Sequence, residues 1–255
     1  MGDWKQDRSQ VTAALQSLIE LWDKRAGEGW QVSSERHGAN VAMISAYTSH
    51  AVNLARGVLA LHSAGLTFES VGLVRSTMEC AVTAAWLAVY PEKTPDLVKY
   101  SAIERRKLLT EIIKHGGGDS TDALAQVAEI EAMEGHTDPE GKWLKNRFEA
   151  LRGGDSLYVT YRALCAWDHA GTGLADMYTF EVPRSEANPW GVVLRDRPND
   201  DLALTWLGLE TSLILRAQIA ADMVLVKPRH KTQLTKWAKK IGASRTINRA
   251  DEPEA

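Results

Sequence analysis

The chain has 255 residues, of which 44% are hydrophobic and 25% charged, and its formal net charge at pH 7 is -3. This ordinary globular mixture excludes wholesale disorder, and the small net charge gives no general argument for nucleic-acid binding. The length suffices for one large domain with a core of its own.

Charge is unevenly distributed along the chain. Residues 227–249 contain eight Lys or Arg and no Asp or Glu, so the first 226 residues hold the other 22 basic residues against 30 acidic ones. We therefore expect a single helical domain over residues 1–226, with its core at about 38–226 and an N-terminal helix (4–25) packed on it. Residues 227–255 are expected to form a basic C-terminal helix and tail.

The apolar residues recur with a helical period almost throughout. The pattern predicts an all-α bundle of about 7–9 helices. Gly65 is expected to end one helix in a left-handed conformation, and Pro91 follows the end of the next. The predicted helices are residues 4–25, 38–64, 67–90, 95–115, 121–134, 143–151, 154–169, 200–226 and 231–241.

Residues 170–199 interrupt the helical pattern with three Pro and three Gly. We expect a long irregular loop here, with a possible small hairpin formed by residues 177–182 and 192–195. A connection of this length is uncommon inside a compact domain and often has a functional role.

The two cysteines, Cys80 and Cys165, lie in apolar helical patterns, so one disulfide is formally possible. The chain opens with charged residues rather than a secretory signal, which favours a reduced, cytoplasmic setting. The longest apolar stretch, residues 202–226, contains Glu210, Arg216, Gln218 and Asp222, which argue against a membrane span.

Arg75 and Glu79 interrupt the apolar stripe of the helix predicted at 67–90. At about 100° per residue they fall in the middle of that stripe, so we expect them to face inward and to pair along one face. Two desolvated ions are costly unless they pair with each other and with further groups. The pair is interpreted either as a structural ion pair or as the anchored charges of a pocket.

Possible partners for this pair come from three other predicted helices. His50 and Glu210 each lie on an apolar stripe, where such groups usually have a structural role. The third helix ends beside the long loop, and loops on a rigid scaffold often carry function. The structural alternative is a polar core layer. The candidates on one face of this helix are Tyr158, Tyr161, Arg162, Cys165 and His169, with Asp168 beside them.

The spacing of Arg162 and His169 resembles the Arg-x4-6-His signature of the HEPN superfamily of helical ribonucleases. Seven residues make two helical turns, so the spacing predicts that both side chains point the same way. The resemblance implies that histidine and arginine act on an RNA phosphodiester at a homodimer interface. The basic C-terminal segment could bind phosphates electrostatically, or it could be a solvated terminal helix.

The segment Leu73-Val-Arg75-Ser-Thr-Met-Glu79 resembles the R-S-x-x-E helix of an uncharacterised bacterial family of helical domains. The segment Tyr161 to His169 is similar to the second pattern of that family, although Cys165 or Ala166 stands where a serine is expected. The likeness covers roughly residues 40–225 and implies that Arg75, Glu79 and His169 belong to one site.

Our first hypothesis is a metal-independent ribonuclease of the toxin or phage-defence type, needing no cofactor. His169 would be the acid or base, Arg162 or Arg75 would stabilise the phosphorane, and Glu79 would orient them. The second is a non-catalytic domain that binds a small molecule or a partner. A third is an enzyme with a metal cluster of Glu79, Glu210, His50 and His169. Zinc, di-iron, phosphate-loop and serine-hydrolase motifs are absent.

Overall fold

The computed structural model describes residues 7–26, 31–32, 38–115, 121–133, 143–198 and 201–252. Within them lie ten α-helices and a two-stranded hairpin, which confirms the all-α prediction. The elements are α1 (Arg8–Ala26), α2 (Gly38–Ser63), α3 (Val71–Val89), α4 (Thr94–His115), α5 (Thr121–Met133), α6 (Leu144–Glu149), α7 (Gly154–Asp168), α8 (Thr172–Met177), β1 (Thr179–Glu181), β2 (Val192–Leu194), α9 (Ala203–Met223) and α10 (Lys231–Ile241).

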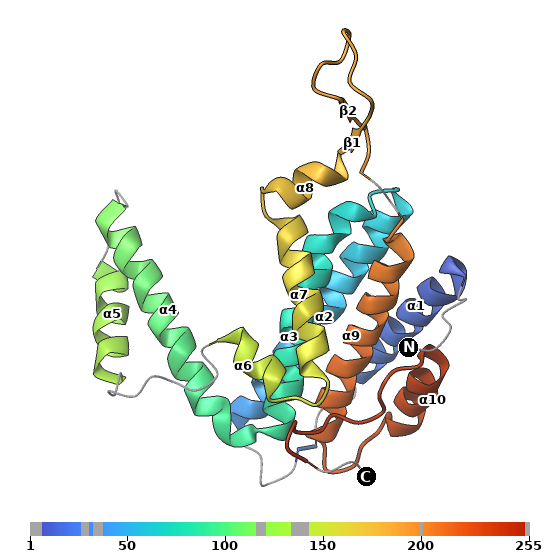
Figure 1. Cartoon of the computed structure of the whole chain (residues 1–255). Helices are drawn as coiled ribbons and strands as arrows, with labels where there is room; N and C mark the ends of the chain where they lie inside the picture. Colours follow the sequence, from blue (N-terminus) through green and yellow to red (C-terminus); the bar gives the residue numbers. More distant parts are fainter. Residues whose placement is uncertain are drawn as a thin grey trace.

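The central helix of the bundle is α3, which packs most extensively against α2 and α9 (Figure 1). Small side chains on α3 allow these neighbours to approach closely. Where α2 passes α3, residue 57 is glycine, and a Cβ at that position would lie 2.9 Å from Cδ1 of Leu73. Fully buried small residues of α3 include Thr77, Ala81, Ala84, Ala85 and Ala88.

The helix α1 packs on α9 through the apolar stripe expected from its sequence. Its last turn is joined to α9 by Arg25, whose Nη1 atom lies 3.9 Å from Oδ1 of Asp222, with both side chains almost completely buried. In the middle of the contact, Nε2 of Gln218 donates a hydrogen bond of 2.7 Å to the carbonyl oxygen of Leu18. These polar contacts fix the register between the two helices. The buried apolar residues of α1 are Val11, Leu15, Leu18, Ile19 and Trp22.

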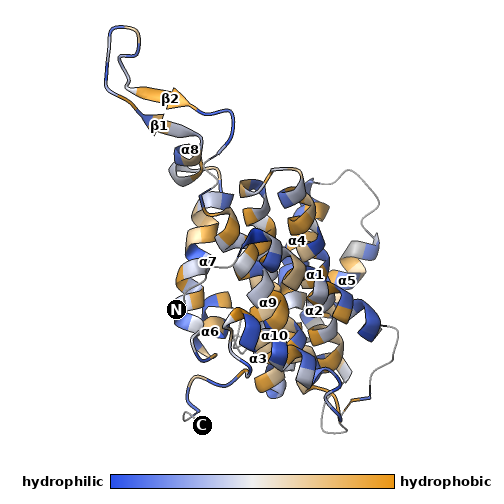
Figure 2. Ribbon diagram, turned by 90° about the vertical axis from the view of Figure 1, so that its right-hand side faces the viewer, coloured by the Kyte–Doolittle hydropathy of each residue, from blue (hydrophilic) through white to orange (hydrophobic). Residues whose placement is uncertain are grey.

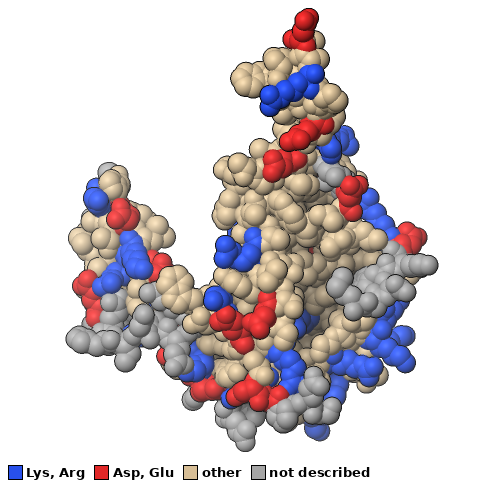
Figure 3. Space-filling view, viewed as in Figure 1, with Lys and Arg blue, Asp and Glu red and all other residues tan. Residues whose placement is uncertain are grey.

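The helix α10 lies against α9 and buries Leu234, Ala238 and Ile241. Its lysines contribute to the basic surface around α10 (Figure 3). After Gly242, which has the left-handed φ of 68°, the chain continues as residues 243–248, which we call the strap. Beyond the strap, Arg249 pairs with Leu151 in an isolated antiparallel bridge. A division between a 1–226 domain and a separate tail stays a prediction.

The helices α4 and α5 form an arm that points away from the bundle (Figure 1). They pack mainly against each other, and α4 contributes Leu97 of its first turns to the core. Beyond Leu97, the helix α4 packs mainly against α5. Several apolar side chains along the arm therefore remain exposed to solvent. They include Val98, Leu108, Ile112 and Leu124.

The region predicted to be irregular contains one more helix, α8, and the expected hairpin. Strands β1 and β2 are antiparallel, with Phe180 opposite Val193. The hairpin projects beyond the end of the bundle, and β2 is strongly hydrophobic although it lies outside the core (Figure 2). Trp190 between the strands is 82% exposed.

Gly65 adopts a φ of 74° directly after α2, as the sequence predicted for this helix end. The helix predicted over residues 67–90 begins as a short 3-10 turn, Phe68–Ser70, which leads into α3 at Val71. Among the described helices, none combines the length and the hydrophobicity that a membrane crossing requires.

Candidate functional site

A chain of polar contacts connects α3 to the C-terminal half of α7. Arg75 Nη1 donates to Oε1 of Glu79 at 2.6 Å along α3, and Arg75 Nε donates to Oδ2 of Asp168 on α7 at 2.8 Å. The hydroxyl of Tyr161 on α7 donates to the same Glu79 oxygen at 2.9 Å. We call Arg75, Glu79, Tyr161 and Asp168 the α3–α7 network. It joins two helices that meet through both charge and hydrogen bonding.

The α3–α7 network is partly open to solvent. The side chains of Arg75, Glu79 and Asp168 are 22%, 37% and 28% exposed. The prediction that Arg75 and Glu79 are enclosed in the interior is therefore wrong, whereas the predicted pairing along one helix face is present. The reason is that α2 and α9 cover the small-residue side of α3, while the shorter α7 covers the side with Arg75 only in part. The further partners of this pair come from α7, one of the three helices expected to supply them.

Arg75 is held as a cation by its partners. Burial acts to lower its pKa, but the charges of Glu79 and Asp168 and the hydrogen bonds that Arg75 makes with Tyr161 and Asp168 outweigh burial and raise the pKa above its usual value. With an acceptor on two sides, the guanidinium is a cross-link between helices more than a free binding group.

Tyr161 is a hydrogen-bond donor in this network and not an acid. Burial, a hydrogen bond with Cys165 and the hydrogen bond to Glu79 all raise the pKa of Tyr161 far above its usual value. Its ring stacks on that of Tyr158 with centroids 6.1 Å apart, and both rings contact Phe148. Tyr158 thus supports the position of Tyr161.

Arg162 and His169 lie outside the network and are exposed. Neither side chain makes a hydrogen bond or an ion pair with another side chain in the part of the chain that the structure describes. The helix α7 ends at Asp168, and His169 has extended backbone with φ of -92° and ψ of 145°. His169 is thus the C-cap of α7, and its backbone N–H still donates to the carbonyl oxygen of Cys165 at 3.2 Å. That the side chains of Arg162 and His169 point the same way stays a prediction.

His50 and Glu210 do not join the network either. His50 is exposed on α2, because the buried face of α2 is the neighbouring one that carries Ile44, Ala51 and Val58. Glu210 is completely buried between α9 and α3, where its Oε1 accepts a hydrogen bond of 2.9 Å from Thr77.

The predicted metal cluster of Glu79, Glu210, His50 and His169 is accordingly not assembled. No group of three or more potential metal ligands converges among the described residues.

Residues 41–183 match the model of a family described as a family of unknown function, DUF5677. The matched segment is 143 of the 255 residues, more than half of the chain. The chain belongs to the DUF5677 family. This confirms the expected membership of a helical family of unknown function, although the match ends at residue 183 and not near 225. Neither the curated proteins nor the solved structures include a match to the chain.

The DUF5677 segment runs from α2 to the first strand of the hairpin and contains the entire α3–α7 network. Arg162 and His169 also lie inside it, whereas Glu210 on α9 lies outside. The α3–α7 network is thus a feature of the part of the chain that the family model covers.

Sequence reasoning missed two polar residues of the DUF5677 segment that lie near Glu79. Arg147 on α6 is buried, donates to Oγ1 of Thr83 at 3.1 Å and lies over the ring of Trp86. Burial lowers the pKa of Arg147, while the charge of Glu79 acts in the opposite direction. A signal was available, because Arg147 lies on one helix face with Leu144 and the buried Phe148.

The second missed residue of this DUF5677 member is Cys80, which follows Glu79 on α3. Burial and the nearby carboxylates of Glu79 and Glu210 raise the pKa of its thiol to about 11. Cys80 and Cys165 are both free thiols. A raised pKa keeps the thiol protonated, so Cys80 is suited to packing and not to nucleophilic chemistry.

Proposed function

We propose that this protein cleaves RNA without a metal ion, using His169 and Arg162 at the exposed face of α7. The observation that carries the proposal is that both side chains are exposed beside the α3–α7 network and have no side-chain partner among the described residues. Groups in this state are available to a substrate, whereas Arg75 is already paired on two sides. The resemblance of the Arg162–His169 spacing to the HEPN signature supports the same reaction.

The proposed chemistry needs no nucleophile from the protein. The ribose 2'-hydroxyl attacks the adjacent phosphorus, the bond to the 5'-oxygen breaks, and a 2',3'-cyclic phosphate forms. His169 takes the 2'-hydroxyl proton or supplies the proton to the leaving 5'-oxygen, since histidine exchanges protons near neutral pH. Arg162 stabilises the negative charge of the phosphorane with its planar set of donors.

In this proposal the α3–α7 network has a positioning role. Asp168 is the last helical residue of α7, and its ion pair with Arg75 holds the helix end from which His169 extends. Glu79 and Tyr161 in turn hold Arg75. A fixed backbone at residue 168 limits the positions that the imidazole of His169 samples.

We further propose that two copies meet along α7, so that each copy contributes to the site. The outer face of α7 carries exposed Val159 and Ala166 on either side of Arg162, and Val159 is 70% exposed. Apolar side chains around a charged group form a surface that a second α7 could cover. Light scattering should then show a homodimer, and Val159→Arg should shift it to monomer.

The activity test is cleavage of a labelled RNA in the presence of a metal chelator. Wild-type protein should produce fragments that end in 2',3'-cyclic phosphate, and His169→Ala should reduce the rate by about 100-fold or more. Arg162→Ala should have a comparable effect. His50→Ala is the matched control, because His50 is also exposed but lies on α2. The proposal is abandoned if the wild type does not cleave RNA or if His169→Ala cleaves equally well.

A second candidate is a non-catalytic domain that binds a small molecule or a partner protein, and one observation favours it. The guanidinium of Arg75 already donates hydrogen bonds to Asp168 and Glu79, as expected for a structural cross-link between helices. The double variant Arg75→Met with Glu79→Gln distinguishes the two. A loss of thermal stability with unchanged RNA cleavage would assign the pair to structure alone, whereas a loss of cleavage with intact stability would assign it to the site.

A further inference from the structure

Arg216 is a cation in the middle of α9, a helix whose inward residues are mostly apolar. Among the described residues its guanidinium has no hydrogen-bond or ion-pair partner. Burial lowers the pKa of Arg216, and no neighbouring carboxylate acts against that shift. Arg216 is half-buried, and a largely desolvated cation without a partner is costly, since the desolvation of the charge is not compensated.

Other enclosed arginines of this protein differ from Arg216 in this respect. Arg25 faces Asp222 at 3.9 Å, and Arg147 contacts the Thr83 hydroxyl and the ring of Trp86. The fold therefore provides partners for its other buried guanidinium groups. For Arg216, no such partner lies among the residues that the structure describes.

Two adjoining cavities lie beside Arg216 and beneath the strap, with volumes of about 130 Å³ and 290 Å³. Arg152, in the turn before α7, lines the larger of the two. No aspartate or glutamate lines either cavity. Both are lined by Gly153, Arg216, Ser244, Thr246 and Ile247.

The lining also supplies uncharged donors. The Thr246 hydroxyl has no partner among the described residues, whereas the Ser244 hydroxyl donates to the carbonyl oxygen of Thr246 at 2.8 Å. Gly153 directly precedes α7, so the positive end of that helix dipole adjoins the cavities. Arg152 also donates to the carbonyl oxygen of Glu252. Its remaining donors, the Arg216 guanidinium, a free hydroxyl and a helix N-terminus together favour an anion.

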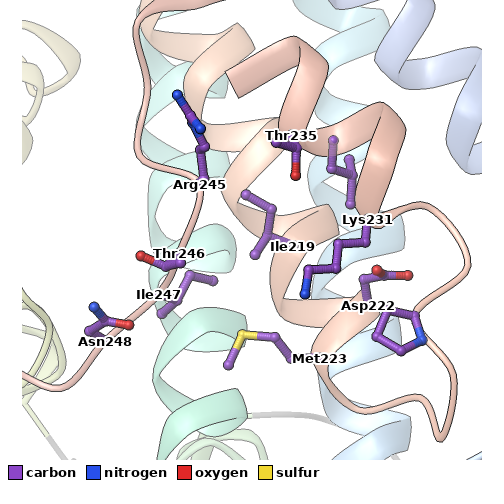
Figure 4. Close-up of a pocket in the computed structure, with 11 residues that line it drawn as sticks. Ile219, Asp222, Met223, Lys231, Thr235, Arg245, Thr246, Ile247 and Asn248 are labelled. Atoms are coloured by element: carbon purple, nitrogen blue, oxygen red, sulfur yellow. The ribbon is translucent and has the colours of Figure 1, made fainter. Parts of the chain in front are cut away.

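A third cavity of about 300 Å³ lies on the other side of the strap, between α9 and α10 (Figure 4). Its wall includes Met223 and Ile219 of α9, and Asp222 and Lys231 lie at one end. Lys231 and Arg245 also line this space, together with the carboxylate of Asp222 and an apolar wall, whereas no carboxylate lines the two cavities beside Arg216. The Arg216 side of the strap is thus distinct in charge.

We propose that Arg216 binds a small phosphate-bearing anion beneath the strap, with Arg152 as the second cation. Guanidinium groups match the paired oxygens of a phosphate, and two of them suit a dianion better than a carboxylate. Both volumes are below the range of about 300–1,000 Å³ that is typical of small-molecule pockets. The ligand is therefore inorganic phosphate or a small phosphate monoester. The site is at the opposite end of α7 from Asp168, so it is independent of the proposed RNA cleavage.

Thermal unfolding of the full chain tests this proposal with sodium phosphate and with glycerol 2-phosphate, each compared with sodium chloride at equal ionic strength. We expect the melting temperature to rise with phosphate beyond the effect of salt, because a ligand that binds the folded state stabilises it. A larger response to glycerol 2-phosphate would identify a monoester as the ligand, and a larger response to phosphate would identify the free ion.

Arg216→Met is the decisive variant. It should abolish the phosphate response and leave the melting temperature without phosphate equal to or higher than that of the wild type, because an uncompensated buried charge is removed. A purely structural arginine predicts the opposite, a lower melting temperature without phosphate. Arg245→Met is the matched control, since it removes one exposed positive charge from the same strap and should keep the response.

The proposal is overturned if phosphate stabilises the wild type no more than sodium chloride does, or if Arg216→Met retains the full response. Should Arg216→Met fail to fold, Arg152→Met gives a second measurement. It should weaken phosphate binding by about tenfold, the value of one charged hydrogen bond. An unchanged affinity in that variant would equally overturn the proposal.

Discussion

The carboxylate of Asp168 lies directly over Gly72. A Cβ at residue 72 would be 2.5 Å from Oδ1 of Asp168, closer than any stable contact between these atoms. Gly72 is one turn before Arg75 on α3, so the missing side chain leaves the space through which Asp168 reaches Arg75 Nε at 2.8 Å. The link between α3 and the end of α7 thus depends on a glycine in the first turn of α3.

Gly72→Ala should disconnect Asp168 from Arg75 at little cost in stability. Alanine favours the helix by about 0.5–1 kcal/mol over glycine, and a partly exposed ion pair contributes about as much. The two effects should nearly cancel in the free energy of unfolding. Amide hydrogen exchange at the end of α7, at residues 168–171, should nevertheless become faster, because its anchor is lost.

The Asp168→Ala background provides the control for this prediction. Without the carboxylate there is no clash, so Gly72→Ala should then stabilise the protein by about 0.5–1 kcal/mol. Equal effects of Gly72→Ala in both backgrounds would show that residue 72 and Asp168 do not interact.

Glu210 should make the protein less stable as pH rises. Burial raises the pKa of Glu210 well above its ordinary 4.5, with only the Thr77 hydrogen bond acting the other way. At a pH between the pKa of Glu210 in the unfolded state and its higher pKa in the folded state, the native protein holds a proton that the unfolded chain releases. The unfolding free energy should therefore decrease with pH above about 4.5, by at most about 1.4 kcal/mol per unit from this group.

Glu210→Gln should remove this contribution, because glutamine has a similar shape and no charge. Urea unfolding at a series of pH values from about 5 to about 7 measures the slope. Glu79→Gln is the matched control: Glu79 is partly exposed, so its replacement should leave the Glu210 contribution in place. A wild type and a Glu210→Gln variant with parallel pH profiles would contradict the buried protonated state.

Cys80 should react slowly with a thiol reagent in the folded protein. With a pKa of about 11, the thiolate fraction at pH 8 is about 0.1%, against about a quarter for a free cysteine of pKa near 8.5, so the rate should fall on the order of 200-fold. The Cys165→Ser variant isolates Cys80 for this measurement with a chromogenic disulfide. Denaturant should restore a rapid reaction, and rapid reaction before unfolding would be inconsistent with the burial of Cys80.

Substitution of two tryptophans should change the stability of the protein by very different amounts. Trp190 at the hairpin is 82% exposed, so Trp190→Ser should change the unfolding free energy by no more than about 0.5 kcal/mol. Trp206 is 5% exposed and packs edge-on against Trp167 with centroids 5.2 Å apart. Trp206→Ala should cost about 3–5 kcal/mol in a denaturant titration. A large loss for Trp190→Ser would mean that the hairpin packs against the protein.

The helices themselves were largely predictable from the sequence. Their apolar period and their end signals, such as Gly65, are local properties of the chain, and local properties are visible in the order of residues. The hairpin at residues 177–195 was predictable for the same reason. The extra helix α8 was missed because its six residues are too few to show a period.

The faces of the helices were less predictable. Large apolar residues marked the expected stripes of α2 and α3, yet the most buried positions include small ones such as Ala51, Thr77 and Ala84. Hydrophobicity alone does not report how closely two helices approach, and close approach is what buries small side chains. His50 and the pair of Arg75 with Glu79 were misplaced for this reason.

The sequence by itself determined an all-α fold, the helices and their ends, and the pairing of Arg75 with Glu79 four residues apart. Only the tertiary structure decided that Asp168 completes this pair over Gly72 and that Arg216, beneath the strap, has no partner among the described residues. Such relationships join residues up to 96 positions apart, as Gly72 and Asp168 show. They depend on how closely helices pack and on which charges the fold leaves uncompensated, and neither quantity is a local property of the chain.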